Sequence, residues 1–496
     1  MTRDLAVRQP LRLHADPTRV IAKLFVPGHP EPRSGRQVSD SVSHVLALDD
    51  QSVSDGVAEL LDRFGHRHRE LTTTFQRHAD RIANRIPEGT DLTVERRVLL
   101  GAAFTHEYSV EAAALCNPSL VPAPDQAGAR PGSLDLVMST RGIGEGHRSS
   151  IGFRAASVDE QGQVSLEPAG SYAETGAVSS ATLHADAFRG MARRIRDDVE
   201  ATSWVLEALG DEFTPSQLDS RLAQLEEQDD TRPGVAETVR RLRALAARAY
   251  CVEFDPATRL DERVLHPVAR AEVNGMEDAR FVRFEDGDHA VYRATYTAYD
   301  GRDISQQLLE TSDFCTFEMS PLQGPAASNK GLALFPRRIG GRFAALSRHD
   351  GTSNAVALTD DIRHWPTSSP LVGEPNLWSS IQVGNCGPPI ETEAGWLVLT
   401  HGVGPMRTYS IGACLLDLDD PTRMIGELAE PLLSPAPDEQ EGYVPNVVYS
   451  CGAVRHGPNL VIPYGIGDAS IGFATASIDA VLAAMTGPSG TDRSRR

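Results

Sequence analysis

Short apolar runs separated by turn residues repeat along the second half of the chain. Four such units begin at Phe281, Leu332, Pro388 and Val448, so their starts lie 51, 56 and 60 residues apart. In each unit an alternating run is followed by a tight turn and a second run, a pattern typical of antiparallel strands. An earlier, less regular unit spans CNPSLVP and SLDLVMSTRG. Repeats of about this size form four-stranded blades, so the pattern predicts a mostly β protein with five blades, a five-bladed β-propeller.

Two stretches have helical spacing instead. Apolar residues recur at intervals of a helical turn from about Gln51 to Ile86, and again from about Ser180 to Ala249 around the polar break EEQDDTRPG. The predicted organisation is an N-terminal helical region over 1–95 and a catalytic propeller domain over 96–490, with a helical insertion at about 180–249. Neither helical stretch carries a catalytic motif, so we expect these parts to serve packing or contacts in a homo-oligomer.

Charge and composition narrow the class of partner. The chain has 48 basic and 68 acidic side chains, a net charge of −20, which repels nucleic acid and anionic membranes. No segment reaches the roughly 18 apolar residues of a membrane helix, and the first residues lack the apolar core of a signal peptide. We therefore expect a soluble, cytoplasmic protein. Its 6 cysteines show no C-x-x-C spacing, which predicts buried free thiols rather than a metal site.

Titratable residues stand at comparable borders of the predicted strands. The segment NGMEDARF places Glu277, Asp278 and Arg280 at the entrance of a strand, where a carboxylate gains nothing from burial unless it is paired or used. An Asp278–Arg280 surface ion pair is the alternative interpretation. Basic residues occupy similar borders in later units, and converging inner strands would gather them into a pocket suited to a small anion such as phosphate. These residues are Lys330, Arg348 and His401.

Other polar residues at strand borders suit sugar hydroxyl groups. Asn117 and Arg141 stand in the first unit, and Asp468 ends the last strand pair. Such groups could hold a sugar by directional hydrogen bonds. The glycine-rich turn RGIGEGHRSS matches neither a dinucleotide fingerprint nor a phosphate-binding loop of nucleotide enzymes, so no nucleotide cofactor is expected. Histidines in the N-terminal helical segment fit a solvated helix face better than a metal site.

Six ordered motifs carry a resemblance to a known family. They are NPSLV at Asn117, EDAR at Glu277, NKGLALFPRRIGGRFAALSR from Asn329, GNCGPPIETEAGWLVLTHGVG from Gly384, EGYVPNVVYSCGA from Glu441 and PYGIGD from Pro463. With them the chain resembles glycoside hydrolase family 130, the β-mannoside phosphorylases and related β-1,2-mannosidases, from about Leu115 to Thr475 apart from the insertion. The resemblance implies a five-bladed propeller that holds the sugar in its central cleft.

The resemblance also implies roles for particular residues. Asp278 is expected to be the sole protein acid, while inorganic phosphate, a co-substrate, attacks the anomeric carbon with inversion and gives mannose 1-phosphate. No metal and no other cofactor is implied. Arg348 and His401 are similar to the family's phosphate-binding residues, and Lys330 stands where a basic residue is usual. The mannosyl-binding positions are Asn117, Arg141 and Asp468, and Glu441 is a further substrate-binding candidate.

One departure keeps a second function open. Gln382 stands where many of the phosphorylases have a lysine, so one charge that would hold phosphate is missing. Hydrolytic members activate water with a carboxylate, for which Glu441 and Glu391 are the candidates. The sequence favours a phosphorylase, a glycosyl-transferring enzyme, over an inverting β-mannosidase acting on β-1,2-mannosides. A non-catalytic propeller that only binds glycans is a third hypothesis, and the linkage and aglycone stay undecided.

Overall fold

The chain divides into two compact units in the computed structural model, which describes residues 5–26, 34–170, 172–192, 199–228, 234–287 and 289–486. The larger unit comprises Met1–Ala15, Ala113–Ala169 and Gly176–Arg496. The smaller unit comprises Asp16–Ala112 and Gly170–Thr175.

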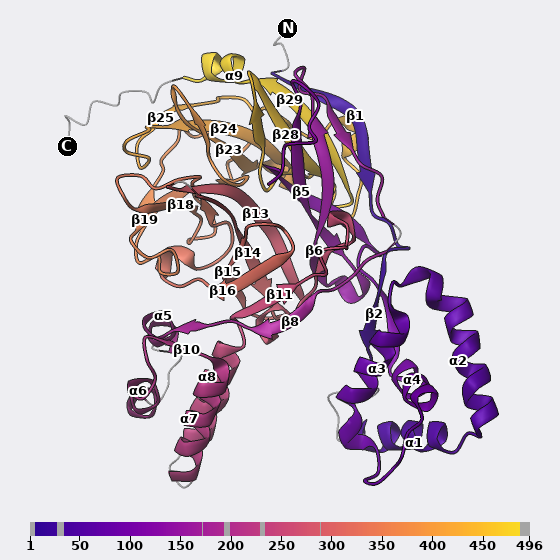
Figure 1. Ribbon diagram of the computed structural model, residues 1–496. Helices are drawn as coiled ribbons and strands as arrows, with labels where there is room; N and C mark the ends of the chain where they lie inside the picture. Colours follow the sequence, from indigo (N-terminus) through magenta and orange to yellow (C-terminus); the bar gives the residue numbers. More distant parts are fainter. Residues whose placement is uncertain are drawn as a thin grey trace. The chain divides into compact units, whose positions relative to one another are not determined.

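The larger unit is mostly β, and its strands pair mainly with sequence neighbours in antiparallel meanders (Figure 1). The first meander is β4 (Ala114–Pro122), β5 (Leu134–Ile143), β6 (Ser149–Val158) and β7 (Val164–Leu166). The second is β13 (Gly275–Asp286), β14 (His289–Tyr299), β15 (Ile304–Thr311) and β16 (Thr316–Pro321). The third is β17 (Ala333–Leu334), β18 (Phe343–Ser347), β19 (Ala355–Thr359) and β20 (Ser369–Pro370).

Two further meanders complete the sheets of this unit. The fourth is β21 (Gln382–Asn385), β23 (Gly395–Val403), β24 (Tyr409–Leu416) and β25 (Met424–Glu427), with β22 (Ile390–Thr392) beside β23. The fifth is β26 (Val448–Tyr449), β28 (Asn459–Ile466) and β29 (Ser470–Ser477), with β27 (Val454–His456) beside β28. The predicted mostly β class is confirmed. No sheet of the described strands closes on itself, so the five-bladed propeller stays a prediction.

The fourth strand of the last meander comes from the start of the chain. Strand β1 (Ala6–His14) lies antiparallel to β29, from Ala6 opposite Ala476 to His14 opposite Ser470. This strand falls inside the region 1–95 that the sequence predicts as helical. Its partner is more than 450 residues away and a bulge interrupts its alternation between Arg8 and Arg12, so no local pattern indicated the pairing.

A buried carboxylate ties β1 to the turn before β26. Glu439, in the short helix η8 (Pro437–Glu439), is 1% exposed and accepts hydrogen bonds from Arg8, Arg12 and the Tyr464 hydroxyl at 2.7–3.2 Å. Because removal of one partner leaves the other buried polar groups unpaired, Glu439→Ala should lower the free energy of unfolding by about 3 kcal/mol. Urea unfolding measures this. The exposed Glu430→Ala is the control, and equal stabilities of the two variants would contradict the role of Glu439.

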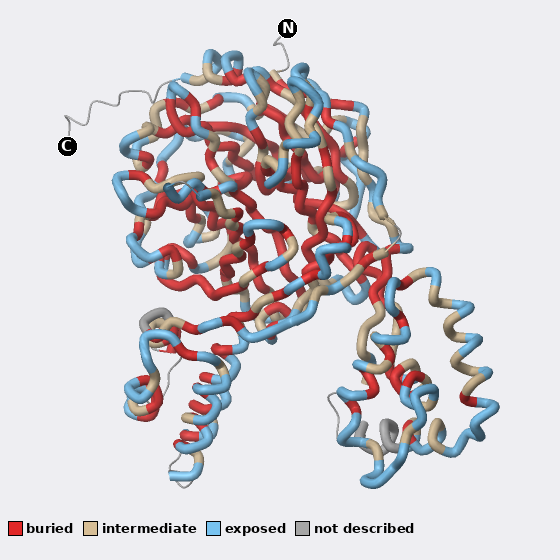
Figure 2. Tube along the Cα trace, viewed as in Figure 1, coloured by how far each residue is buried: buried red, intermediate tan, exposed pale blue. Residues whose placement is uncertain are grey.

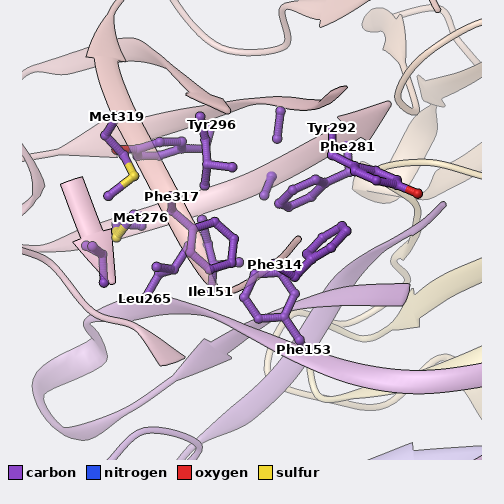
Figure 3. Close-up of a cluster of buried hydrophobic side chains, with 14 of the residues drawn as sticks. Ile151, Phe153, Leu265, Met276, Phe281, Tyr292, Tyr296, Phe314, Phe317 and Met319 are labelled. Atoms are coloured by element: carbon purple, nitrogen blue, oxygen red, sulfur yellow. The ribbon is translucent and has the colours of Figure 1, made fainter. Parts of the chain in front are cut away.

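An aromatic core lies between the first two meanders (Figure 3). The ring of Phe153 stacks on that of Phe317 with centroids 5.5 Å apart, and it meets Phe281 edge-on at 6.0 Å. Met276 and Phe281 are both buried in this core, so they anchor β13 on either side of residues 277–280. Figure 2 shows that many strands in the interior of this unit are buried, while many of the connecting loops face solvent. The core thus fixes the strand that carries the EDAR motif.

The segment between the first two meanders contains helices and short strands. The elements are β8 (Ala177–Ser180), β9 (Leu183–His184), α5 (Ala185–Ala192), α6 (Val199–Glu207), β10 (Glu212–Phe213), α7 (Pro215–Gln228), α8 (Val235–Ala246), β11 (Tyr250–Glu253) and β12 (Val264–Leu265). Strand β11 extends the second meander by pairing with β16. The hydroxyls of Tyr250 and Tyr296 both donate to the buried carboxylate of Glu272, which joins the insertion to β14.

The smaller unit consists of helices with one strand pair. It contains β2 (Val20–Leu24), α1 (Ser34–Leu46), α2 (Asp50–Phe64), α3 (Leu71–Arg81), α4 (Val94–Ala103) and β3 (Thr105–Ser109). Side chains of Asp49 and Thr93 cap α2 and α4 by accepting from the amides of Ser52 and Arg96. The larger unit ends with α9 (Ile478–Ala484). Among the described helices, none has the length and apolar character needed to span a membrane.

Candidate active site

Two β-bulges turn a carboxylate and an amide toward each other. The register of β4 shifts between Cys116 and Ser119, and that of β13 shifts between Glu277 and Arg280. The bulged residues Asn117 and Asp278 have φ of 49° and 57°, in the left-handed region that Asn and Asp tolerate better than most residues. The Asn117 Nδ2 donates to the Asp278 Oδ1 at 2.6 Å. The bulges therefore bring together two residues 161 positions apart.

Arg141 and Lys330 bind the carboxylates of the EDAR motif. Arg141, on β5, donates from Nη1 to the Asp278 Oδ1 at 3.1 Å and from Nη2 to the Glu277 Oε1 at 2.7 Å. The Lys330 Nζ donates to the Glu277 Oε2 at 2.6 Å. Glu277 thus bridges the two cations and fixes the guanidinium against Asp278. Side chains here are largely buried, except that Lys330 is 34% exposed and connects the group with solvent.

The electrostatic surroundings keep Asp278 charged. Burial raises the pKa of its carboxyl, but Arg141, Arg280 and Lys330 lower that pKa by more, so it lies well below the usual value. Arg280 is 1% exposed and donates to the main-chain carbonyl of Asp278 at 3.0 Å and to the Tyr449 hydroxyl at 2.7 Å. Its guanidinium therefore holds the backbone of Asp278 instead of forming the carboxylate pair that the sequence offered as an alternative.

Arg348 and His401 form a second basic pair. The Arg348 Nη1 lies 2.9 Å from the His401 Nε2, and the His401 Nδ1 lies 3.1 Å from the Asn385 carbonyl oxygen. A carbonyl can only accept, so Nδ1 carries the proton and Nε2 accepts from Arg348. Burial and the Arg348 charge lower the pKa of His401 to about 3. His401 is thus neutral and orients Arg348, which supplies the positive charge.

Asn385 links the two groups of basic residues. Its side-chain Nδ2 donates to the Gly331 carbonyl at 2.6 Å, directly after Lys330, while its main-chain carbonyl accepts from His401. A Cβ at Gly384, the neighbouring residue, would overlap the His401 ring, so this position of the GNCG turn requires glycine. Asn385 and Tyr449 are site residues to which sequence reasoning gave no role, although both stand inside quoted motifs.

The remaining candidate residues differ in how close they lie to the cluster around Asp278. Asp468 follows β28 and interacts electrostatically with Arg141 and Asp278, which places it beside the cluster. Glu441 is exposed, and its main chain packs against Gly467, the neighbour of Asp468. Glu391 pairs with Arg337 at 2.7 Å and lies opposite Trp396, five residues before His401 on β23, or roughly 17 Å along the strand. The structure does not bring Glu391 to the site.

Asp468 should make the free energy of unfolding decrease as the pH rises. Burial and the Asp278 charge raise the pKa of Asp468 to about 6 against the opposing effect of Arg141. Because the folded state binds this proton more tightly than the unfolded chain, the stabilisation is complete below the usual pKa of 3.8 and is lost as pH rises through about 6. The wild type should lose stability relative to Asp468→Asn between pH 5 and pH 7, as urea unfolding would measure. A pH-independent difference would contradict the raised pKa.

Comparison with known proteins gives the same family that the motifs indicate. A family model described as beta-1,4-mannooligosaccharide phosphorylase, that of glycoside hydrolase family 130, matches residues 256–486. A 1,2-beta-oligomannan phosphorylase of Thermoanaerobacter sp. is 35% identical over 223 residues, 44% of this chain and 73% of that protein. A beta-1,2-mannobiose phosphorylase of Listeria innocua is 34% identical over 233 residues, 45% of this chain and 64% of that protein.

A solved structure is also similar. It is the Listeria innocua beta-1,2-mannobiose phosphorylase in complex with beta-1,2-mannobiose. The match covers 76% of the present chain and 92% of the Listeria chain, at 23% identity and a TM-score of 0.45. On the sequence matches, the chain belongs to glycoside hydrolase family 130. The family match includes Asp278, Lys330, Arg348, His401 and Asp468, whereas Asn117 and Arg141 lie before it.

Proposed function

We propose that the protein is an inverting β-mannoside phosphorylase, which cleaves β-linked manno-oligosaccharides with inorganic phosphate and releases mannose 1-phosphate. The observation that carries this proposal is the separation of charge in the site. The Asp278 carboxylate accepts from Asn117 and Arg141, whereas Glu277 is already engaged by Arg141 and Lys330, and Arg348 is oriented by its own histidine, His401. The names of the related phosphorylases support the same reaction.

The five meanders are proposed to be the blades of a five-bladed propeller. In a propeller the first strand of each blade lines the centre, so residues from these strands become neighbours. Each meander contributes a residue of the cluster from its first strand or from the turn before it. These residues are Asn117 on β4, Asp278 on β13, Lys330 before β17, Asn385 on β21 and Tyr449 on β26. The common position of all five supports the radial arrangement.

Asp278 acts as the acid only after substrate changes its surroundings. In the free protein the carboxylate is ionised and its Oδ1 is occupied by Asn117 and Arg141. A sugar that takes over these hydrogen bonds raises the carboxyl pKa and lets Asp278 take up a proton. The anomeric C–O bond then breaks, phosphate oxygen forms the new bond to that carbon, and the proton lost by hydrogen phosphate ends on the leaving hydroxyl. Asp278 relays this proton, directly or through a sugar hydroxyl.

Arg348 is the proposed centre of phosphate binding. Its Nε is buried and has no hydrogen-bond acceptor among the described residues, whereas its Nη1 is occupied by His401. A buried N–H without an acceptor is costly, and a phosphate oxygen would satisfy it with a charge-assisted bond. Lys330 adds a second, more exposed charge at Glu277. Together these donors can hold the nucleophile although Gln382 supplies no charge.

Product analysis with and without inorganic phosphate tests the proposed reaction. Purified protein is given β-1,2- and β-1,4-linked mannobiosides, and mannose 1-phosphate should form only when phosphate is present. Free mannose in phosphate-free buffer would overturn the proposal and make the protein an inverting β-mannosidase. Glu441→Gln would then be the first variant to examine, because Glu391 is tied to Arg337. The panel also decides the linkage, which is β-1,2 in the names of the two relatives and β-1,4 in the description of the family model.

A further inference from the structure

A cavity of about 340 Å³ lies between the third and fourth meanders, and its lining includes none of the residues of the cluster around Asp278. Its lining includes Asn354, Trp378, Ser380, Thr400 and Glu427. Thr400 is the strand neighbour of His401 on β23, and successive side chains of a strand point to opposite faces. The cavity therefore opens on the face of the fourth meander that is turned away from His401. Residues 371–380, which have no helix or strand, form its outer wall.

The indole of Trp378 packs closely against two glycines in this wall. A Cβ at Gly402 or at Gly412, on neighbouring strands, would overlap the indole ring, so the ring occupies the space that these glycines leave open. The indole Nε1 donates to the Ala429 carbonyl at 3.1 Å. The ring is thus fixed by contact on one side and by a hydrogen bond at its edge, as is expected of a preformed binding wall.

Asn354 presents an unpaired polar group to the same cavity. Its side chain is 4% exposed, and its Oδ1 has no hydrogen-bond partner among the described residues. A buried amide oxygen without a donor is unfavourable by about 1–3 kcal/mol, which a hydroxyl group in the cavity would relieve. Thr400 and Ser380 add hydroxyls, and Glu427 adds a carboxylate that disfavours an anion.

We propose that this cavity is a second carbohydrate site, which binds one neutral pyranose unit. An apolar aromatic wall with a few convergent amide, hydroxyl and carboxylate groups matches the C–H face and the hydroxyl groups of a sugar ring. The volume lies at the lower end of the range for ligand sites and suits a single ring. The acidic lining excludes phosphate as the occupant. The inference does not depend on the reaction proposed for the Asp278 cluster.

Sugar binding is tested with Asp278→Asn protein, which prevents turnover, and with D-mannose, methyl β-D-mannoside and β-1,2-mannobiose as probes. Calorimetry should find two sugar sites per chain, and one site after Asn354→Leu is added. The exposed Asn84→Leu makes the same change in the smaller unit, at a residue that does not line the cavity, and should leave two. Equal affinity for mannose and mannobiose at this site would indicate recognition of the free sugar, whereas binding of the disaccharide alone would indicate a chain of sugars.

Tryptophan fluorescence gives an independent measurement at the cavity. Among the 4 tryptophans, all of them described, Trp378 is the one that lines the cavity, so its fluorescence should show a saturable change that Trp378→Phe removes and Asn354→Leu shifts to at least tenfold higher sugar. One site in both Asp278→Asn and its Asn354→Leu derivative, or unchanged fluorescence at saturating sugar, would overturn the proposal. Phosphorolysis by the wild type is measured separately, so its absence would affect only the proposed reaction.

Discussion

Asp278→Asn should reduce kcat for phosphorolysis by about 10²–10⁴-fold while the protein stays folded. Asparagine keeps the shape and can still contact Asn117 and Arg141, but it cannot take up and release the proton that the leaving oxygen needs. The loss should appear in kcat rather than in the KM for phosphate, because Arg348 and His401 are untouched. Steady-state formation of mannose 1-phosphate measures the effect.

The control for this substitution lies on the same strand. Asp286→Asn makes the same chemical change at the exposed end of β13 and should leave kcat unchanged within a factor of about two. Near-ultraviolet circular dichroism of both variants reports whether the aromatic core under β13 is intact. Wild-type kcat in folded Asp278→Asn would rule out Asp278 as the acid.

Arg348→Met should raise the KM for phosphate by about 100-fold with a much smaller change in the KM for the mannoside. Because the low pKa of His401 keeps its imidazole neutral, Arg348 is the main charge of this pair, and Lys330 is already engaged by Glu277. Methionine keeps the length and much of the apolar volume, so the loss reports on charge and hydrogen bonding. Initial rates over a matrix of both substrates separate the two KM values.

Arg342→Met provides the matched control for phosphate binding. Arg342 is exposed and precedes β18, the strand that Arg348 follows, so the two variants differ in which end of the strand loses its charge. We expect no change in either KM from Arg342→Met. A mannoside KM that rises as much as the phosphate KM in Arg348→Met would show that Arg348 serves sugar binding instead.

The repeated strand pattern predicted the meanders well because each strand pairs mainly with its sequence neighbour. The units starting at Phe281, Leu332, Pro388 and Val448 correspond to the second to fifth meanders. The sequence analysis did not predict strand β1. Its partner β29 lies far away in the sequence, and pairing over such a distance leaves no local periodicity. The hydrophobic pattern therefore indicates which segments are strands, whereas the pairing of strands that are distant in the sequence is seen only in the structure.

In the candidate site, too, the sequence indicated some features and only the structure shows the others. The sequence singled out Asn117, Arg141, Asp278 and Lys330 at the borders of apolar strands, and the structure joins these residues by hydrogen bonds directly or through Glu277. The bulges that aim Asn117 and Asp278 at each other could not be read from the residues, since a bulge depends on the register of the partner strand. The neutral state of His401 likewise follows from burial and from Arg348, not from its place in a motif.

The pairing of β1 with β29 also has a consequence for biosynthesis. The strand Ser470–Ser477 leaves the ribosome some 460 residues after Ala6–His14. At 5–20 residues per second this delay is roughly 20–90 s, during which an unpaired strand edge is exposed to other chains. The strand Ala6–His14 thus stays without its partner until the strands of the first four meanders have been synthesised.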